Sequence, residues 1–288
     1  MELRHIAARS GRLSSFLREE MRMSAGLMNR LKWKEGLFVN GKPVHTDFAV
    51  QPGDVITVPL DEPAPEYPAQ DGALSVLYED EHLLAVDKPA GMLIHPSRSR
   101  FTGTLANYVL GYYQKTGQNS AFHPLTRLDR DTFGVVLLAK NSHIHSLLMS
   151  GEVKKAYHAW VCGYPGEDTG IIDAPIGRLP LPSLLRQVME DGKPSVTEYK
   201  VLEQRGELCK LELNPVTGRT HQLRVHCAHM GFPILGDPQY GNERSREISA
   251  KLGLSTQLLQ AKRLRFSHPI NGEIVEISSA LNGEIPCF

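Results

Sequence analysis

The sequence predicts an α+β protein with two domains joined by a short proline-rich connector. The chain has 288 residues, and since a domain takes roughly 150 residues, its length allows two. Three prolines alternate with acids within residues 61–72, a composition that favours an extended, semi-rigid connector. Beyond it, predicted strands outnumber helices and do not alternate with them, which favours a mostly antiparallel sheet. We therefore expect a small α/β domain over residues 1–60 and a larger α+β domain over residues 73–288.

The small domain is predicted from helical spacing in its first half and turn signals in its second. Apolar side chains recur at helical spacing over residues 12–22 and again after Ser24, whose hydroxyl can cap a second short helix. The pair Asn40-Gly41 is a strong signal for a tight hairpin, and a strand is expected over residues 55–60. We therefore expect two helices followed by a hairpin and a strand.

Basic residues are in modest excess in this small domain. Residues 1–60 contain nine Lys and Arg against six Asp and Glu, a local formal balance of +3. The excess is concentrated on and after the second predicted helix, at Arg30, Lys32 and Lys34. The whole chain carries 32 residues of each sign and no net charge. An anionic partner can therefore be indicated only by where the charges lie.

The larger domain is predicted to contain a sheet with flanking helices. Runs rich in aliphatic and β-branched residues predict strands at residues 74–78, 83–86, 135–138 and 156–161. Helical spacing of apolar side chains predicts helices at residues 105–113 and 142–149.

Cysteine usage, hydropathy and missing motifs exclude several classes of protein. The four cysteines form no Cys-x-x-Cys pair, which argues against a zinc ribbon or a disulfide framework. No apolar run reaches about 18 residues, and the N-terminus lacks the apolar segment of a signal peptide. Phosphate-binding glycine loops, the Gly-x-Ser-x-Gly elbow and His-Glu-x-x-His are missing, which disfavours cofactor-dependent chemistry. We expect a soluble, cytoplasmic monomer that does not associate with membranes.

Asp129 is the first candidate for chemistry. It lies between Arg127 and Arg130 in a charged loop immediately before a predicted apolar strand. Loop aspartates often do no more than cap a turn, but Asp131 offers a separate capping group here. Gly134 would permit close approach of the backbone to a bound ligand. The loop therefore predicts a reactive carboxylate presented at the edge of a sheet.

Tyr157 is the second candidate, because Lys154 and Lys155 precede it in a predicted strand. A tyrosine in a sheet is most often half-buried with its hydroxyl satisfied. An aromatic ring beside basic side chains can also stack on a nucleic-acid base while the cations hold the backbone.

The third candidate is a dense run of polar side chains that contains Arg219 and Arg224. Two arginines this close favour an anionic partner, either a phosphate or a buried carboxylate. The spacing of His221, His226 and His229 also suggests a metal site, but the additional ligands that such a site needs do not follow in any usual order. We therefore expect no metal.

Residues 231–241 follow this run and are dense in glycine and proline. Turn signals at this density do not fit a continuous helix. We expect this segment to shape a loop and to supply no catalytic group.

Residues 73–288 resemble the RluA/RluD-like family of RNA pseudouridine synthases along nearly their whole length. The central motif is Arg-Leu-Asp-Arg-Asp-Thr at residues 127–132. The other motifs of the family correspond, in order, to residues 77–96, 155–157, 218–224 with 236–238, and 264–269. Residues 12–60 are similar to the small RNA-binding domain named after ribosomal protein S-four.

The resemblance implies an enzyme that converts uridine in RNA to pseudouridine without a cofactor or metal. It implies that Asp129 is the catalytic aspartate, which attacks the ribose or takes a proton from it while the glycosidic bond breaks. The freed uracil then turns and rejoins through carbon five. Arg219 would pair with Asp129 and keep it ionised, and Tyr157 would stack on the uracil and could remove the proton from carbon five. The uridine must leave the helical stack to react, at a cost of a few kcal/mol.

Basic and polar side chains around these motifs are expected to contact structured RNA, with ribosomal RNA favoured and transfer RNA possible. In the larger domain they are Arg127, Arg130, Lys155, His221, Gln222 and Arg224, and in the small domain Arg30, Lys32 and Lys34.

Two positions beside the catalytic motif depart from the family pattern. Thr126 stands where many members have His, and Phe133 stands where Ser is usual. We expect these positions to affect base flipping and the choice of target uridine. The reaction itself is not affected, because Asp129, Tyr157 and Arg219 are all present.

Two alternatives remain open at this point. The chain could be a non-catalytic RNA-binding protein, which would predict the loss of one of the three key side chains. It could also be a nucleoside or glycoside hydrolase that uses Asp129 and Asp131 as a carboxylate pair. Residues two apart in a strand point the same way, so their spacing allows such a pair.

Overall fold

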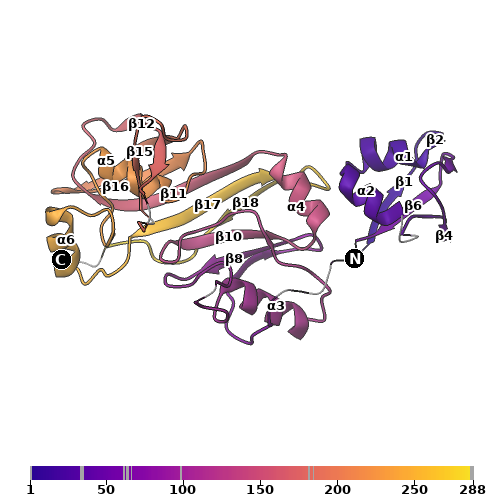
Figure 1. Ribbon diagram of the computed structural model, residues 1–288, viewed down its shortest axis with the longest axis horizontal. Coiled ribbons are helices and arrows are strands. Elements are labelled where there is room, and N and C mark those ends of the chain that lie inside the picture. The colour runs from indigo at the N-terminus through magenta and orange to yellow at the C-terminus, as the bar shows by residue number, and fades with distance from the viewer. Residues whose placement is uncertain are drawn as a thin grey trace.

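The computed structural model describes the chain except for residues 1, 33–35, 61, 63–64, 66, 98, 181, 184 and 286–288. The first 60 residues form a small unit with its own hydrophobic core (Figure 1). Its main sheet has the order β1-β6-β3-β4, and a second pair joins β2 to β5. The strands are β1 (Glu2–Ile6), β2 (Gly11–Arg12), β3 (Phe38–Val39), β4 (Lys42–Pro43), β5 (Ala49–Val50) and β6 (Val55–Pro59). The helices are α1 (Leu13–Ser15), the π-helical turn η1 (Phe16–Glu20) and α2 (Ala25–Lys32).

Local signals in the sequence account for these elements. The N–H of Leu27 donates to the Ser24 hydroxyl at 3.2 Å, so Ser24 caps α2 as predicted. Asn40 and Gly41 form the turn between β3 and β4 with φ of 51° and 75°. Positive φ at both central residues is the geometry that Asn-Gly favours in hairpins. The second predicted helix, the hairpin and the strand are therefore confirmed, whereas the first predicted helix is the short α1 continued by the π-helical turn η1.

The connector after residue 60 is attached to the larger domain at several points. The N–H of Ser142, at the start of α4 (Ser142–Met149), donates to Glu62 at 2.6 Å. The N–H of Gln70 donates to the carbonyl of Asn107, and the Asn107 amide donates to the carbonyl of Pro68. The described part of the connector is therefore docked by hydrogen bonds, which the prediction of a semi-rigid spacer did not include.

A long, twisted sheet forms the centre of the larger domain (Figure 1). Its order is β12-β15-β16-β11-β17-β10-β8-β7, with β18 beside β17 and β9 beside β10. Among the described strands of this sheet, every pairing is antiparallel except β10 with β17. The strands are β7 (Val76–Glu79), β8 (Leu83–Lys88), β9 (His123–Pro124), β10 (Phe133–Ala139), β11 (Val153–Cys162), β12 (Thr169–Asp173), β15 (Val196–Arg205), β16 (Leu208–Pro215), β17 (Leu259–Ser267) and β18 (Ile274–Ser278). The predicted α+β class is confirmed.

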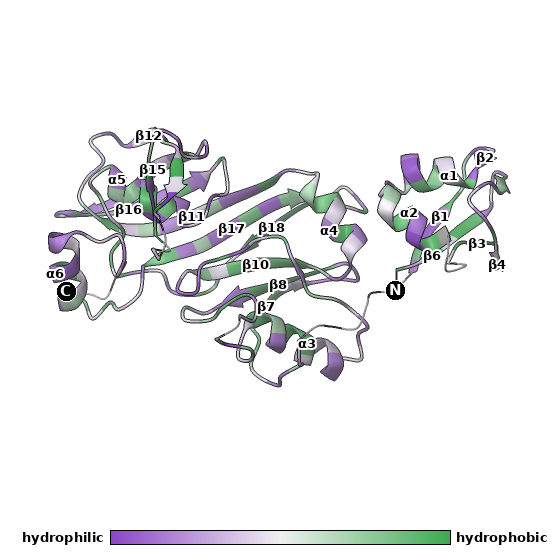
Figure 2. Cartoon of the chain, in the orientation of Figure 1, coloured by the Kyte–Doolittle hydropathy of each residue, from purple (hydrophilic) through white to green (hydrophobic). Residues whose placement is uncertain are grey.

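Helices cover both faces of the middle of this sheet. The remaining helices are α3 (Leu105–Lys115), α5 (Gln222–His229) and α6 (Glu243–Lys251). Side chains alternate along β8 and β10, so that Val86 and Val136 pack in the core shared with α3 and α5, while Ala85 and Val135 pack in the core shared with α4. Both strands are fully buried, and Figure 2 shows them as predominantly hydrophobic. This rigid centre supports the loops at its ends.

Candidate active site

Asp129 lies in the loop between β9 and β10, at the end of the buried centre of the sheet. Its side chain is 28% exposed, and its Oδ2 accepts a hydrogen bond from Nη1 of Arg224 at 3.0 Å. The carboxylate is thus held by a cation and still reachable from outside. This combination fits a group that meets a substrate.

Asp131 faces a different partner from Asp129. Its two carboxylate oxygens accept hydrogen bonds from Nε and Nη2 of Arg130 at 2.9 and 2.8 Å. Both aspartates precede β10 and lie in a loop, so the strand alternation assumed for a carboxylate pair does not apply. The two aspartates are therefore held by different arginines, Asp131 by Arg130 and Asp129 by Arg224.

Arg224 is the buried centre of the site. It lies on α5 with a side chain 5% exposed, and its Nε and Nη2 donate to Oδ2 and Oδ1 of Asp237 at 2.7 and 2.8 Å. Nη2 also donates to Oε1 of Gln239 at 2.8 Å. Burial opposes the charge on Arg224, but the carboxylates of Asp237 and Asp129 outweigh it and raise the pKa of Arg224. Arg224 therefore stays charged and points a fixed donor at Asp129.

Arg219, which was predicted to pair with Asp129, lies elsewhere. Its Nε donates to the carbonyl of Pro194 at 3.1 Å, and the side chain is exposed. The predicted Arg219–Asp129 pair is therefore wrong in this structure, and Arg224 takes that position. The reason is local: α5 begins at Gln222, so Arg224 lies on the helix and turns inward, while Arg219 remains in the preceding loop.

The loop of residues 231–241 holds Arg224 in place, a role that the prediction of a shaping loop did not include. Besides binding Arg224, Oδ1 of Asp237 accepts from the N–H groups of Gln239 and Tyr240 at 2.9 and 3.1 Å. These bonds fix the carboxylate that in turn fixes Arg224. The sequence signal for this role was the Gly236-Asp-Pro238 motif, whose aspartate was not considered as a partner for an arginine.

His221 borders Asp129 on the other side, with Nε2 at 3.9 Å from Oδ2. Its Nδ1 lies 2.8 Å from the hydroxyl of Tyr240, which accepts the N–H of Arg186 at 3.0 Å. Burial lowers the pKa of His221, an effect that the nearby Asp129 carboxylate opposes. His221 adopts a left-handed backbone conformation with φ of 58°.

Tyr157 lies on β11 in the core that faces α3 and α5. A register shift in the pairing of β11 with β17 falls between Ala156 and Tyr157, and such bulges re-aim side chains beside active sites. Burial, together with the Asp129 carboxylate, raises the pKa of Tyr157 far above its ordinary value. The side chain is therefore a neutral phenol close to Asp129.

Lys88, at the end of β8, anchors the loop that carries Asp129. Its ammonium is fully buried and donates to the carbonyls of Pro89, Met92 and Arg130, each at 2.9 Å. Burial lowers the pKa of Lys88 to about 8, although Asp131 and Asp129 oppose the shift. This residue was not among the predicted site residues, although a lysine at the end of a buried strand is an uncommon enough feature to draw attention.

Several predicted RNA contacts are used inside the protein. The amide of Gln222 donates to the carbonyl of Val196 and the hydroxyl of Thr197, and its oxygen accepts from Thr217 and the N–H of Arg219. Gln222 and Arg224 are buried, so both are part of the scaffold of the site and do not form an RNA-facing surface.

The other predicted RNA contacts remain predictions. Arg127 is exposed, Arg130 is 59% exposed although tied to Asp131, and Lys155 is half-buried, which lowers its pKa. Arg30 is exposed on α2. Lys34 and the side chain of Lys32 lie outside the described residues.

The positions that depart from the family pattern are buried in the fold. The Thr126 hydroxyl accepts the N–H of Leu137 at 3.2 Å, and Phe133 packs at the start of β10. Gly134 has a φ of 111°, and a Cβ there would lie 2.3 Å from the carbonyl oxygen of Ala261. The close approach that Gly134 permits is therefore to β17 and not to a ligand. A role for Thr126 and Phe133 in target choice would have to be indirect.

Comparison with known proteins identifies the chemistry to which this geometry belongs. A family model described as RNA pseudouridylate synthase matches residues 82–229. RNA pseudouridine synthase YlyB of Bacillus subtilis is 39% identical over 86% of this chain and 83% of its own. Ribosomal large subunit pseudouridine synthase C of Vibrio cholerae is 31% identical over 95% of this chain and 90% of its own.

The chain belongs to the RNA pseudouridylate synthase family.

Solved structures agree with this assignment. The structure of human RNA pseudouridylate synthase domain containing 1 has a TM-score of 0.59 and 29% identity, covering 74% of this chain and 85% of its own. The protein is thus an RNA pseudouridine synthase, an isomerase, and neither the non-catalytic alternative nor the hydrolase describes it.

The region matched by the family model includes most of the site but not all of it. Lys88, Asp129, Tyr157 and Arg224 fall within residues 82–229, whereas Asp237 lies beyond that range.

Among the described residues, no helix is both long and apolar enough to cross a bilayer.

Proposed function

We propose that this RNA pseudouridine synthase acts through Asp129 on uridines of ribosomal RNA. The observation that carries the proposal is the hydrogen bond of 3.0 Å from buried Arg224 to the partly exposed carboxylate of Asp129. A charged donor holds the carboxylate in one position, and a positioned Asp129 is needed whether it attacks the ribose or takes a proton from it.

Arg224 replaces Arg219 as the residue proposed to keep Asp129 ready for reaction. Its Nε and Nη2 donate to Asp237 and Gln239, and these bonds oppose rotation of the guanidinium when substrate binds. Such preorganisation places the carboxylate before the substrate arrives. Arg224 acts through Asp129 and is a positioning residue.

Tyr157 is proposed to pack against the flipped uracil. A base that leaves the helical stack loses stacking energy, and an aromatic ring in the site offsets part of that loss. Because its pKa is raised, Tyr157 enters the reaction as a neutral phenol. A neutral phenol is suited to packing against the base and donating a hydrogen bond, and less suited to removing the proton from carbon five. No metal or cofactor is proposed for the reaction.

Ribosomal RNA is proposed as the substrate for two reasons. Three of the relatives are named ribosomal large subunit pseudouridine synthases, two of them C and one D. The small N-terminal unit has its own core and a local excess of basic residues, which suits a separate RNA-binding domain resembling that of ribosomal protein S-four.

The test uses RNA that carries tritium at carbon five of uridine. A transcript of large-subunit ribosomal RNA and a set of transfer RNA transcripts, all without modified nucleotides, are incubated with the protein in separate reactions. We expect tritium release to water from the ribosomal transcript, with no free uracil, because isomerisation exchanges the hydrogen at carbon five and retains the base. Release from transfer RNA alone would contradict the proposed substrate. Free uracil would contradict the reaction.

A further inference from the structure

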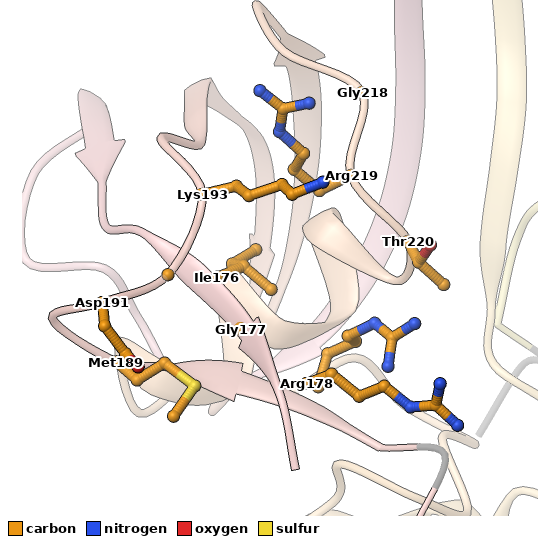
Figure 3. Close-up of a pocket in the computed structure, with 11 residues that line it drawn as sticks. Ile176, Gly177, Arg178, Met189, Asp191, Lys193, Gly218, Arg219 and Thr220 are labelled. Carbon is orange, nitrogen blue, oxygen red and sulfur yellow. The ribbon is translucent and has the colours of Figure 1, made fainter. Parts of the chain in front are cut away.

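A cationic cavity of about 490 Å³ lies beside the Asp129 site. It is formed between the hairpin β13 (Ile176–Arg178) and β14 (Arg186–Val188), residues 191–193 and residues 218–220. Four of its lining residues are basic, namely Arg178, Arg186, Lys193 and Arg219, and one is acidic, Asp191. Figure 3 shows Lys193 and Arg219 on one side of the cavity and Arg178 on the other, with Asp191 beside Met189 away from these cations.

Three of the four cations of this cavity, Arg178, Lys193 and Arg219, have no acidic partner among the described residues. Within the described part of the chain, neither Arg178 nor Lys193 forms an ion pair, and Arg219 donates only to the carbonyl of Pro194. Cations that converge on a concave surface without matching acids attract anions and raise their local concentration. The cavity is therefore suited to a negatively charged ligand.

The backbone around the cavity is closely packed, so the cations are presented by a fixed frame. Ile176 and Lys193 exchange N–H to carbonyl hydrogen bonds, both of 2.9 Å. A Cβ on Gly192 would lie 2.7 Å from the backbone carbon of Ile176, and a Cβ on Gly177 would lie 2.0 Å from the sulfur of Met189. At Gly192 the close atoms are backbone, so only glycine allows this approach, whereas at Gly177 the Met189 side chain would have to move. The frame holds Lys193 opposite the hairpin.

The cavity and the Asp129 site share a wall. Arg219 and Thr220 line the cavity and immediately precede His221, which lies 3.9 Å from Asp129. The N–H of Arg186 donates to the hydroxyl of Tyr240, which bonds to His221, and the charge on Arg186 contributes to lowering the pKa of His221. A ligand in the cavity would therefore be a close neighbour of a nucleotide held at Asp129.

We infer that this cavity binds backbone phosphates of the RNA strand next to the flipped uridine. The inference rests on the proposed function and identifies where the substrate strand is held. Arginine and lysine side chains suit phosphate oxygens. The lining contains no aromatic residue on which a base could stack, so the contact is to the backbone and carries no base preference. Binding energy gained here would offset the cost of flipping the base.

The test combines a loss of charge, a gain of charge and a matched control in the full-length protein. Lys193→Gln with Arg178→Gln removes two cations from the cavity, and Asp191→Asn removes its acid. Lys115→Gln is the control, since Lys115 is 74% exposed at the end of α3 and lies outside this cavity. Fluorescence anisotropy measures binding of labelled oligouridylate from low to high salt, and tritium release from the ribosomal transcript gives KM and kcat.

The double variant should bind oligouridylate at least tenfold more weakly at low salt. The slope of log affinity against log salt should shrink by about 0.7 for each phosphate that the protein no longer neutralises, so by about 1.4 for two. In the double variant KM should rise, while kcat should stay within about threefold of the wild-type value. Asp191→Asn should bind oligouridylate a few-fold more tightly, and Lys115→Gln should match wild type. Circular dichroism of the double variant should be that of the wild type, because both side chains lie at the cavity surface.

A double variant with the wild-type salt slope and KM would overturn the inference. Micromolar binding of inorganic phosphate by calorimetry, abolished in the double variant while RNA binding stays unchanged, would also overturn it, since the cavity would then serve a small phosphorylated ligand. If the wild type released no tritium but oligouridylate binding still depended on Lys193 and Arg178, the proposed function would fail and the phosphate site would stand.

Discussion

The Asp129 site and the neighbouring cationic cavity use arginine in opposite ways. In the first, Arg224 is 5% exposed and donates to the carboxylates of Asp129 and Asp237 and to the amide oxygen of Gln239. In the second, Arg178 and Lys193 have no described ion pair and face a cavity. A buried arginine with carboxylate partners fixes the geometry of a reactive group. Cations without such partners are available to hold a ligand.

Arg219 and Arg224 belong to one short segment but have these two different roles. Arg219 and Arg224 are five residues apart, yet the first donates to a carbonyl at the cavity and the second holds Asp129. Loss of Arg224 should therefore affect the rate of the chemical step, and loss of Arg219 should affect RNA binding. Substitutions can test each half of this comparison, beginning with the largest expected effect.

Asp129→Asn should abolish turnover and leave RNA binding within a few fold. The amide keeps the shape of the side chain but cannot attack the ribose or accept its proton, and loss of such a group costs on the order of 10³-fold or more in kcat. Arg224 keeps its pair with Asp237, so the fold should persist. Tritium release measures turnover, and anisotropy measures binding. Near wild-type activity in this variant would remove Asp129 from the mechanism.

Arg224→Lys should lower kcat by about 10²-fold. Lysine cannot bind Asp237 at two points and still reach Asp129. The Asp129 carboxylate would therefore be slightly misplaced, and a small misplacement of a catalytic group has an effect of that size. The free energy of unfolding should fall by about 3 kcal/mol, as expected when a buried ion pair loses its geometry. Steady-state kinetics and urea denaturation measure the two effects.

Arg219→Lys is the matched variant, with the same chemical change in the exposed arginine of the same segment. It should raise KM a few fold and leave kcat and the unfolding free energy near wild type. Equal losses of kcat in the two variants would mean that the separation between the two sites is not functional.

The sequence allowed the fold to be predicted well because its signals are local. Ser24 caps a helix, Asn40-Gly41 makes a hairpin, and the aliphatic run before Lys140 is a strand buried on both faces. Asp129 could also be proposed, since its flanking charges and family motif lie within a few residues.

The partner of Asp129 could not be predicted in the same way. Arg224 and Asp129 are 95 positions apart, and the choice between Arg219 and Arg224 depends on where α5 begins. Asp237 was missed because its segment reads as turns, and the Gly236-Asp-Pro238 motif does not by itself show that its carboxylate binds a buried cation. Long-range charge pairing of this kind follows from packing and has no periodic signature in the sequence.

Lys88→Met tests the buried anchor beneath the Asp129 loop. It should lower the unfolding free energy by about 3 kcal/mol at pH 7, because three carbonyls lose their donor. The folded pKa of Lys88 is about 8 against 10.5 when unfolded. Between these values the unfolded chain holds more protons, so the lysine contribution to stability rises with pH.

The stability difference between wild type and Lys88→Met should therefore widen above pH 8, by at most about 1.4 kcal/mol per pH unit. Urea denaturation of both proteins at pH 7 and pH 9.5 measures this. If the difference narrowed over this range, the surroundings of Lys88 would stabilise its charged form, and burial would not lower its pKa.

Removal of residues 1–60 should act on RNA binding alone. The core of the small unit is formed by its own side chains, so the larger domain should retain its fold. Its net charge of +3 is modest, and Arg9 is already bound to Glu19 and Glu20. We expect affinity for the ribosomal transcript to fall about tenfold at low salt, with a shallower salt slope and unchanged kcat, because the truncated protein neutralises only a few phosphates fewer. If the truncated protein kept the wild-type slope, the small unit would not contact RNA, and the cavity beside Asp129 would provide the main electrostatic hold on the substrate.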